Sequence, residues 1–277
     1  MANKVLHRLT ALKKGNGTYL IIFFLLFILA IGIALGIRGL NLYQSSQFIT
    51  NSFTVLITAE EPYIIRLDSR QDTLSILHIK DALLDTQHLT KASIDAAVPI
   101  QASITLVDGE IENIDQVLSV GAILRQIAQG KVQLTGMNEF DVVKFMYLAK
   151  KVPHENISRK EIEDYIANTA VLGQIEEDLY ELFRDPTVIN ERISIEVVNA
   201  TQISGLATTV SHMLENGGYN VVAIRSEDTQ KSVIQSSLSD SVTLTQLKQT
   251  FPFPIAARSE NAVSDIKIVI GTDVLTE

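Results

Sequence analysis

The chain contains no cysteine and comparatively few charged residues. Asp, Glu, Lys and Arg make up 20 % of its 277 residues, below the roughly 25 % that is usual in soluble domains. Without cysteine it cannot form a disulfide scaffold, a zinc finger or a cysteine nucleophile. It also lacks a P-loop, a dinucleotide-binding fingerprint and a G-x-S-x-G motif, so the enzyme classes that depend on these motifs have no signature here.

Basic residues are outnumbered by acidic ones, 23 to 32, which gives a formal net charge of -9. A nucleic-acid-binding protein usually carries a basic face, so we expect no nucleic-acid partner. The length allows one or two domains at about 100–200 residues each. The mean hydropathy is nevertheless positive, at +0.20, which indicates that apolar residues are concentrated in one place.

That place is residues 19–37, which hold 19 residues without a charge. As a helix they span just under the roughly 30 Å of a bilayer's hydrocarbon core. A chain in lipid must satisfy its backbone polar groups internally, so the segment is expected to be helical. We predict a single transmembrane helix over residues 19–38.

The flanking charges predict the orientation of this helix. Residues 1–18 hold four basic residues and no acid, and no charge follows Arg38 until Glu60. Basic flanks stay in the cytoplasm, so 1–18 is a cytoplasmic tail and 39–277 is extracytoplasmic. The alternative is a cleavable signal peptide, whose apolar region usually has about 7–15 residues and a small-x-small cleavage site. The longer run, with no clear cleavage site after it, favours an uncleaved anchor in the cell membrane.

Charge is divided unequally across the predicted membrane. Residues 1–38 contain five basic residues and no acid, so the remaining chain has 18 basic and 32 acidic residues, a net charge of -14. Such an exported part is not drawn to anionic surfaces by its overall charge. Any anion binding has to be local.

Residues 39–51 read as a polar linker, and 52–186 as a first α+β domain. Strands are predicted over 53–58, 63–67, 73–79 and 102–107, and helices over 114–129, 139–152 and 158–184. A turn over 68–72 joins two of the strands, Asn138 caps the second helix, and a capping-box pattern at Ser158–Glu161 opens the third. Asp185-Pro186 ends this region, because the residue before proline avoids the α conformation.

Residues 187–277 form a second small α+β domain. Strands are predicted over 193–198, 219–224, 232–235 and 266–270, and helices over 206–215 and 242–249. Ser204 is the expected cap of the first of these helices, and Gly217-Gly218 is its stop. The order is βαββαβ-like, with both helices on one face of the sheet.

This last region resembles the C-terminal domain of the LytR/CpsA/Psr family over roughly residues 191–273. The resemblance begins with a strand, a turn and a Gly-Leu-Ala helix start, and continues with a second glycine and a closing strand. The residues that carry it are Asn199, Ser204, Gly205, Leu206, Ala207, Gly218, Gly271 and Asp273. The turn after Asn199 has one glycine, and no Lys or Arg occurs between 193 and 224. We therefore interpret these residues as structural, with anion binding at the helix start as the alternative.

The resemblance implies a catalytic domain before this one, which in the family attaches lipid-linked glycopolymers to peptidoglycan. Residues 52–186 share its strand and hairpin order, but its Arg-Ser-Asp-Thr element is replaced by Ala59–Pro62, and Lys80-Asp81 stands where Arg-Asp is expected. Phosphoryl transfer depends on fixed guanidinium groups that lysine does not replace. We predict a reduced, non-catalytic domain. The alternative is an active phosphotransferase in which Arg66, Arg70, Lys80 and Asp81 form the site.

The remaining features predict no cofactor or metal site. The five histidines do not have ligand spacing, and the acidic run Glu176–Asp178 lacks an EF-hand pattern. The prediction is a membrane-anchored, extracytoplasmic protein of the bacterial cell envelope that binds or scaffolds. Its expected partners are the membrane and a cell-wall glycopolymer or another envelope protein. Transcriptional regulation is disfavoured, because an 18-residue tail is too short for a DNA-binding fold.

Overall fold

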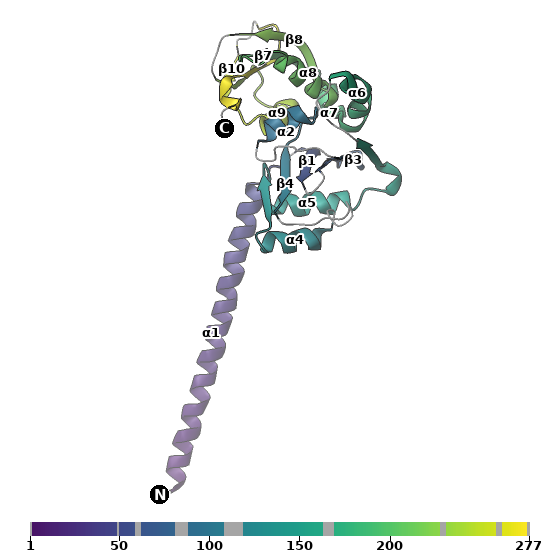
Figure 1. Ribbon diagram of the computed structural model, residues 1–277. Helices are drawn as coiled ribbons and strands as arrows, with labels where there is room; N and C mark the ends of the chain where they lie inside the picture. Colours follow the sequence, from purple (N-terminus) through teal and green to yellow (C-terminus); the bar gives the residue numbers. More distant parts are fainter. Residues whose placement is uncertain are drawn as a thin grey trace. The chain divides into compact units, whose positions relative to one another are not determined.

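The protein is mixed α+β, with two sheets and one apolar N-terminal helix, as the sequence predicts. The computed structural model describes residues 2–48, 50–58, 62–80, 88–107, 119–162, 169–227, 231–258 and 262–275. It contains two compact units, Met1–Ser46 and Gln47–Glu277, which are described separately (Figure 1).

The first unit is one helix, α1 (Ala2–Gln44). Its part Tyr19–Gln44 is long and apolar enough to cross a membrane, with a mean hydropathy of 3.2 over 18 residues and no burial within the protein. The helix is longer than the predicted span, since it includes residues 2–18 and the first part of the expected linker, up to Gln44. Extending an existing helix adds one hydrogen bond per residue without a new nucleation cost.

The second unit begins with a six-stranded sheet in the order β5-β4-β1-β2-β3-β6. Its strands are β1 (Ser52–Thr58), β2 (Pro62–Asp68), β3 (Thr73–Ile79), β4 (Ala102–Leu106), β5 (Val132–Thr135) and β6 (Ile157–Ile162). β1 is parallel to β4, and β3 to β6, whereas the other neighbours are antiparallel. The predicted turn between β2 and β3 is present, and Asp68 accepts hydrogen bonds there from the backbone of Arg70 and Gln71.

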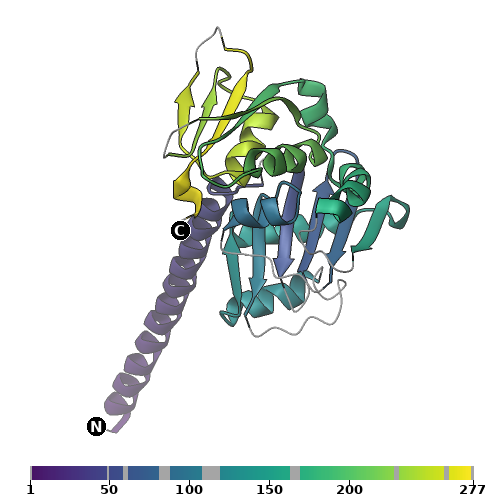
Figure 2. The ribbon, with the colours of Figure 1, turned by 45° about the horizontal axis from the view of Figure 1, so that its top comes forward.

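Helices cover both faces of this sheet (Figure 2). On one face α4 (Val120–Ala128) and α5 (Glu139–Ala149) pack on a core that includes Val55 and Phe145. On the other, α2 (Leu89–Asp95) and α6 (Thr169–Phe183) pack on a core that includes Leu56 and Leu179. Successive strand residues point to opposite faces, so β1 is buried on both sides.

The prediction that a helix starts at the capping-box pattern Ser158–Glu161 is wrong. This segment is strand β6, which pairs in parallel with β3 from Leu74 opposite Ile157 to Ile79 opposite Ile162. The hydrogen bonds of this ladder pair the backbone N–H and C=O groups of β3 along one edge. Their free energy outweighs that of a local capping motif. Charged side chains along β6 suit an exposed sheet edge, and the helix itself, α6, begins at Thr169.

The second sheet has the order β10-β9-β11-β7-β8. Its strands are β7 (Ser194–Asn199), β8 (Asn220–Ser226), β9 (Val233–Ser236), β10 (Ile255–Ala257) and β11 (Ile266–Ile270). The accompanying helices are α7 (Pro186–Glu191), α8 (Leu206–Asn216) and α9 (Val242–Thr250), and the chain also has short 3-10 turns, η1 (His154–Asn156) and η2 (Thr272–Leu275). The predicted βαββαβ order is present with one strand added, β10, which at three residues is too short to give a sequence pattern.

Helices α8 and α9 pack on one face of this second sheet. Val210 of α8 and Leu247 of α9 contribute to one core with Ile195, Val197 and Ile268 of the strands. The same helices contact α2 and α6 from the first sheet. The second unit is therefore a stack in which two helix layers meet between the two sheets (Figures 1 and 2).

The chain enters the second unit through a contact with α5. Phe48 is buried against Phe53 and Phe145. The fully buried carboxylate of Asp141 accepts hydrogen bonds from the backbone N–H groups of Gln47 and Phe48, at 3.0 and 3.3 Å. It also completes a capping box with the predicted cap, Asn138. One side chain thus fixes both the start of α5 and the entry of the chain.

Replacing Asp141 with alanine is expected to destabilise the second unit. The change removes the acceptor of three backbone N–H groups, and we expect the free energy of unfolding to fall by about 3 kcal/mol. Urea unfolding of the full chain in detergent measures this loss. Asp141→Asn keeps one oxygen and should lose less. A change below about 0.5 kcal/mol for Asp141→Ala, typical of a neutral surface site, would contradict this role.

Candidate functional site between the two sheets

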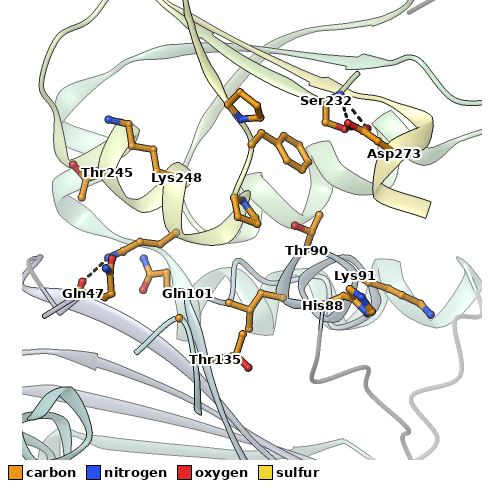
Figure 3. Close-up of a pocket in the computed structure, with 16 residues that line it drawn as sticks. Gln47, His88, Thr90, Lys91, Gln101, Thr135, Ser232, Thr245, Lys248 and Asp273 are labelled. Carbon is orange, nitrogen blue, oxygen red and sulfur yellow. Dashed lines mark hydrogen bonds between the residues drawn. The ribbon is translucent and has the colours of Figure 1, made fainter. Parts of the chain in front are cut away.

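A groove of about 790 Å³ lies where the two sheet regions meet. Its volume is within the range of small-ligand sites. One side is formed by α2, by Gln101 just before β4 and by the end of β5, and the other by α9, the segment 252–254, Ser232 and Asp273 of η2. Figure 3 shows these side chains around the groove. The lining residues are Gln47, His88, Leu89, Thr90, Lys91, Gln101, Thr135, Gly136, Ser232, Thr245, Lys248, Gln249, Pro252, Phe253, Pro254 and Asp273.

Hydrogen bonds fix the two walls of the groove to each other. Thr90 of α2 donates to the backbone oxygen of Thr250 at 3.1 Å, and Gln249 donates to the backbone oxygen of Gln47. On the floor, Gln101 accepts a 2.7 Å hydrogen bond from the backbone of Thr54 in β1. The groove therefore keeps its shape through bonds that join segments far apart in the sequence.

Two local features set the outline of the groove. Gly136 has a φ of +70°, and a Cβ at this position would lie 2.5 Å from the backbone oxygen of Gln101. Only glycine fits there without strain. Opposite, α9 starts at a fixed place, because Ser241 caps it and the Glu191 carboxylate accepts from the N–H groups of Val242 and Thr243.

The groove contains cationic groups on both walls. Lys91 lies in α2 and Lys248 in the last turn of α9, and they lie toward opposite ends of the groove (Figure 3). The acidic group is Asp273, whose carboxylate accepts from both the backbone and the hydroxyl of Ser232. Asp273 thus holds the segment around Ser232 in place, and the lining carries two lysines beside this one carboxylate.

A buried ion pair lies deeper in the same junction. Arg66 of β2 and Asp185, which caps α7, are 6 % and 2 % exposed, with Arg66 Nη2 3.7 Å from Asp185 Oδ2. Gln246 of α9 donates to Asp185 at 2.7 Å and accepts from the buried hydroxyl of Tyr219 at 2.9 Å. Asp68 adds a second carboxylate 3.5 Å from Arg66.

Burial and charge act in opposite directions on this pair. Burial lowers the pKa of the Arg66 guanidinium, and the two neighbouring carboxylates oppose this shift. Burial also raises the pKa of the Asp185 carboxyl, but Arg66 and the hydrogen bonds from Gln246 and the backbone outweigh it, so this pKa lies below its usual value. Burial raises the pKa of Tyr219, which stays protonated and donates.

The residues proposed for an active phosphotransferase are not gathered in one place. Arg66 is opposite Ser75 in the β2–β3 ladder, about 16 Å along the strand from Lys80 at 3.3 Å per residue. Lys80 pairs with Glu161 of β6. Arg70 is exposed in the turn between β2 and β3, and Asp81 lies outside the described residues. Arg66 contributes to the junction instead.

The residues of the C-terminal motif have structural positions. Asn199 accepts from the backbone and hydroxyl of Thr201 and donates to the backbone oxygen of Ile203 at 2.7 Å, which shapes the turn before α8. Gly218, at a φ of +86°, ends that helix region, and Gly271 donates its N–H to Ser232. Leu206 and Ala207 are buried on α8.

The prediction that Ser204 caps α8 is wrong. The residue at the N-cap is Gly205, whose φ of +82° is in the left-handed region, and no side chain caps the helix there. Ser204 is exposed. Asn199 already organises the turn, so the chain enters α8 through a glycine rather than through a hydroxyl cap.

Sequence reasoning did not find the groove. Its lining comes from segments as far apart in the sequence as Gln47 and Asp273, and no short motif joins them. In the described part of the chain, no group of three or more His, Asp or Glu side chains is arranged to hold a metal ion. The polar side chains that line the groove are instead amides, hydroxyls, two lysines, a histidine and one carboxylate.

Comparison with known proteins confirms the resemblance of the C-terminal region. Residues 192–273 match the family described as "LytR cell envelope-related transcriptional attenuator". The chain thus contains a domain of this cell-envelope-related class. The match does not extend to residues 52–186, for which the relation to the catalytic domain stays a prediction. No curated protein matches the chain.

Solved structures give only distant similarities. The transcriptional regulator yvhJ from Bacillus subtilis is 12 % identical in sequence, with a TM-score of 0.31. The alignment covers 47 % of this chain and 96 % of that chain. The putative transcriptional factor Lmo1026 from Listeria monocytogenes is 13 % identical in sequence, with a TM-score of 0.26. The alignment covers 40 % of this chain and 80 % of that chain. At these values the similarities do not bear on fold or function.

Replacing Asp185 with asparagine is expected to weaken the junction strongly at neutral pH. Removing Asp185 leaves the buried Arg66 with Asp68 as its remaining carboxylate, so we expect a loss of about 3 kcal/mol of the free energy of unfolding, at the low end for a broken buried ion pair. Urea unfolding of the full chain in detergent measures the loss. As a matched control, Asp240→Asn changes an exposed acid and should cost less than about 0.5 kcal/mol.

The difference between the natural chain and the Asp185→Asn variant should depend on pH. The folded pKa of Asp185 is depressed, so its stabilising effect is complete above the unfolded pKa of about 3.9. That effect is lost as the pH falls through the folded pKa. Unfolding measured from pH 7 down to pH 3 should show the two free energies converging below about pH 4. A constant gap would contradict the ion-pair role.

Proposed function

We propose that the protein is a membrane-anchored component of the bacterial cell envelope whose extracytoplasmic part has a non-catalytic, binding or scaffolding role. The observation that carries this proposal is the occurrence, in one chain, of a cell-envelope-related domain at residues 192–273 and a spanning-length apolar helix at Tyr19–Gln44. The groove between the two sheets supplies a surface on which binding can occur.

The orientation follows from charge. The basic residues before the apolar helix favour a cytoplasmic N-terminus, which places Gln47–Glu277 outside the cytoplasm. The absence of cysteine suits an oxidising exterior, since no thiol is available for oxidation.

Two arrangements of charged residues support a non-catalytic role. Phosphoryl transfer requires guanidinium groups that reach the substrate. Arg66 is buried in its ion pairs with Asp68 and Asp185, so it cannot reach a ligand without breaking the junction. Lys80 is paired with Glu161 on an exposed strand edge. The alternative requires Arg66 and Lys80 to converge, and in the described part of the chain these two residues lie apart.

Arginine substitutions within the apolar helix are expected to abolish stable membrane association. Each arginine at the centre of a spanning helix costs about 2.5–3.5 kcal/mol of insertion free energy. The double variant Leu26→Arg/Ile28→Arg should therefore leave the membrane fraction during carbonate extraction, whereas Leu26→Ala/Ile28→Ala should stay in it. A carbonate-resistant arginine variant would show that this helix is not the anchor.

The orientation is tested by protease treatment of intact spheroplasts. The part of the chain beyond residue 39 should be digested, while an epitope placed at the N-terminus should be protected. Complete protection of the whole chain would overturn the proposed orientation. In the same cells, crosslinking followed by purification of the anchored chain should recover cell-wall glycopolymer or another envelope protein, and recovery of neither would overturn the binding role.

A further inference from the structure

We propose that the protein forms a two-fold dimer in which strand β8 of one copy pairs, antiparallel, with β8 of a second copy. The two five-stranded sheets then join into one continuous sheet across the two-fold axis. This inference goes beyond the proposed envelope role. It depends on the open edge of β8, on the apolar side chains exposed along it, and on the low charge of this edge.

Strand β8 lies at one end of the second sheet, at the top of Figure 1. Among the described strands, the other sheet edges are β5, β6 and β10. Native proteins usually protect an edge with charge, proline or a short strand, because its unpaired backbone groups invite another strand. β5 has four residues, β10 has three and follows Pro254, and β6 carries Arg159, Lys160 and Glu161. β8 has seven residues and a single charge, at Arg225, so it is the edge best able to accept a strand.

The edge of β8 exposes an apolar strip. Val222 is 48 % exposed and Ile224 is 47 % exposed, and alternation along a strand directs both to the same face. Ile224 pairs with Val197 of β7, whose side chain belongs to the core beneath the helices. The strip therefore continues that core outward to the edge of the sheet, where a further strand with apolar side chains would cover it.

Charge favours a second copy of β8 as this strand. Two copies of residues 39–277, each with a net charge of -14, repel each other over most of their surface. The charged residue of β8 is neutralised locally, because Arg225 Nε lies 3.1 Å from Glu196 Oε1. A strongly acidic or basic strand finds no complementary charge on this edge. A second β8 is itself nearly neutral and apolar, so it meets no repulsion there.

The side chains also indicate a register, centred on Ala223. In this register Val222 of each copy lies opposite Ile224 of the other, and the two-fold axis makes this apolar pair twice. Each Arg225 lies opposite Val221, so the two guanidinium groups are apart, whereas a register centred on Arg225 would place like charges opposite each other. The ladder of β8 with β7 has one bulge, between Val221 and Ala223, and all seven residues remain strand.

One strand from each copy makes a small interface compared with the roughly 1,200–2,000 Å² that stable complexes bury. We therefore expect weak association of dilute chains in detergent. Copies anchored in one membrane have a high effective concentration, which compensates for a weak contact. This step rests on the proposed anchoring, so the association is tested in intact cells that make the full chain.

The absence of cysteine allows a direct crosslinking test. Ala223→Cys places two thiols opposite each other at the axis, where Cα atoms are about 4.5–5.5 Å apart, within the range of a disulfide. Copper phenanthroline oxidises the two thiols to the disulfide, and a non-reducing gel measures the dimer. The matched control Ala257→Cys changes an exposed alanine on the β10 edge. Because disulfides do not form beyond about 7 Å, we expect at least about fivefold more dimer from Ala223→Cys.

A charge exchange tests the register. In the Ala223→Cys chain, Val222→Lys or Ile224→Glu alone sets a charge against an apolar side chain, and we expect each to reduce the dimer several-fold. The two changes together should restore it, because each lysine then lies opposite a glutamate of the other copy. Both positions are exposed, so folding should be unaffected, which thermal unfolding verifies.

Equal dimer yields from Ala223→Cys and Ala257→Cys would overturn the proposal, as would a double variant that dimerises no better than the single ones. Photocrosslinking from benzoylphenylalanine at position 222 identifies the neighbour of the edge. A product of twice the chain's mass supports the dimer, and a product formed only with a different protein overturns it. These outcomes leave the carbonate extraction and protease results unchanged, so a failure here is distinguishable from a failure of the proposed envelope role.

Discussion

The ion pair between Arg66 and Asp185 joins the two sheets of the second unit. Arg66 comes from the middle of the first sheet, and Asp185 starts the helix that leads into the second. Gln246 extends the contact to α9 and to the buried hydroxyl of Tyr219. Two charges removed from water are costly unless each is compensated, so both halves must keep one mutual arrangement for the carboxylate and guanidinium to remain satisfied.

The groove is a consequence of that arrangement. Its walls belong to different sheets, and α9 carries both Gln246, which contacts Asp185, and Lys248, which lines the groove. The bonds from Thr90 and Gln249 close the same junction at its surface. A rotation of one sheet against the other would separate these groups together. The stability of the junction and the shape of the candidate binding site therefore have the same origin.

Much of the local structure was predictable because it depends on neighbouring residues. Short apolar segments rich in β-branched residues predicted β1, β2 and β3, Asn138 predicted the start of α5, and Gly217-Gly218 predicted the end of α8. Prediction failed where a distant partner decided the outcome. The segment Ser158–Glu161 has a local helix signal, but pairing with β3 makes it a strand. Ser204 has a capping side chain, but the bonds of Asn199 place Gly205 at the cap instead.

The sequence by itself determined the apolar helix, the α+β composition and the relation of residues 192–273 to a cell-envelope family. These features depend on periodicity, local charge and short motifs, which are all readable along the chain. Only the tertiary structure decided that Arg66 belongs to a buried junction with Asp185, and that Lys91 and Lys248 share a groove. The physical reason is that burial, charge compensation and the shape of a cleft depend on residues that become neighbours only when the two sheets pack together.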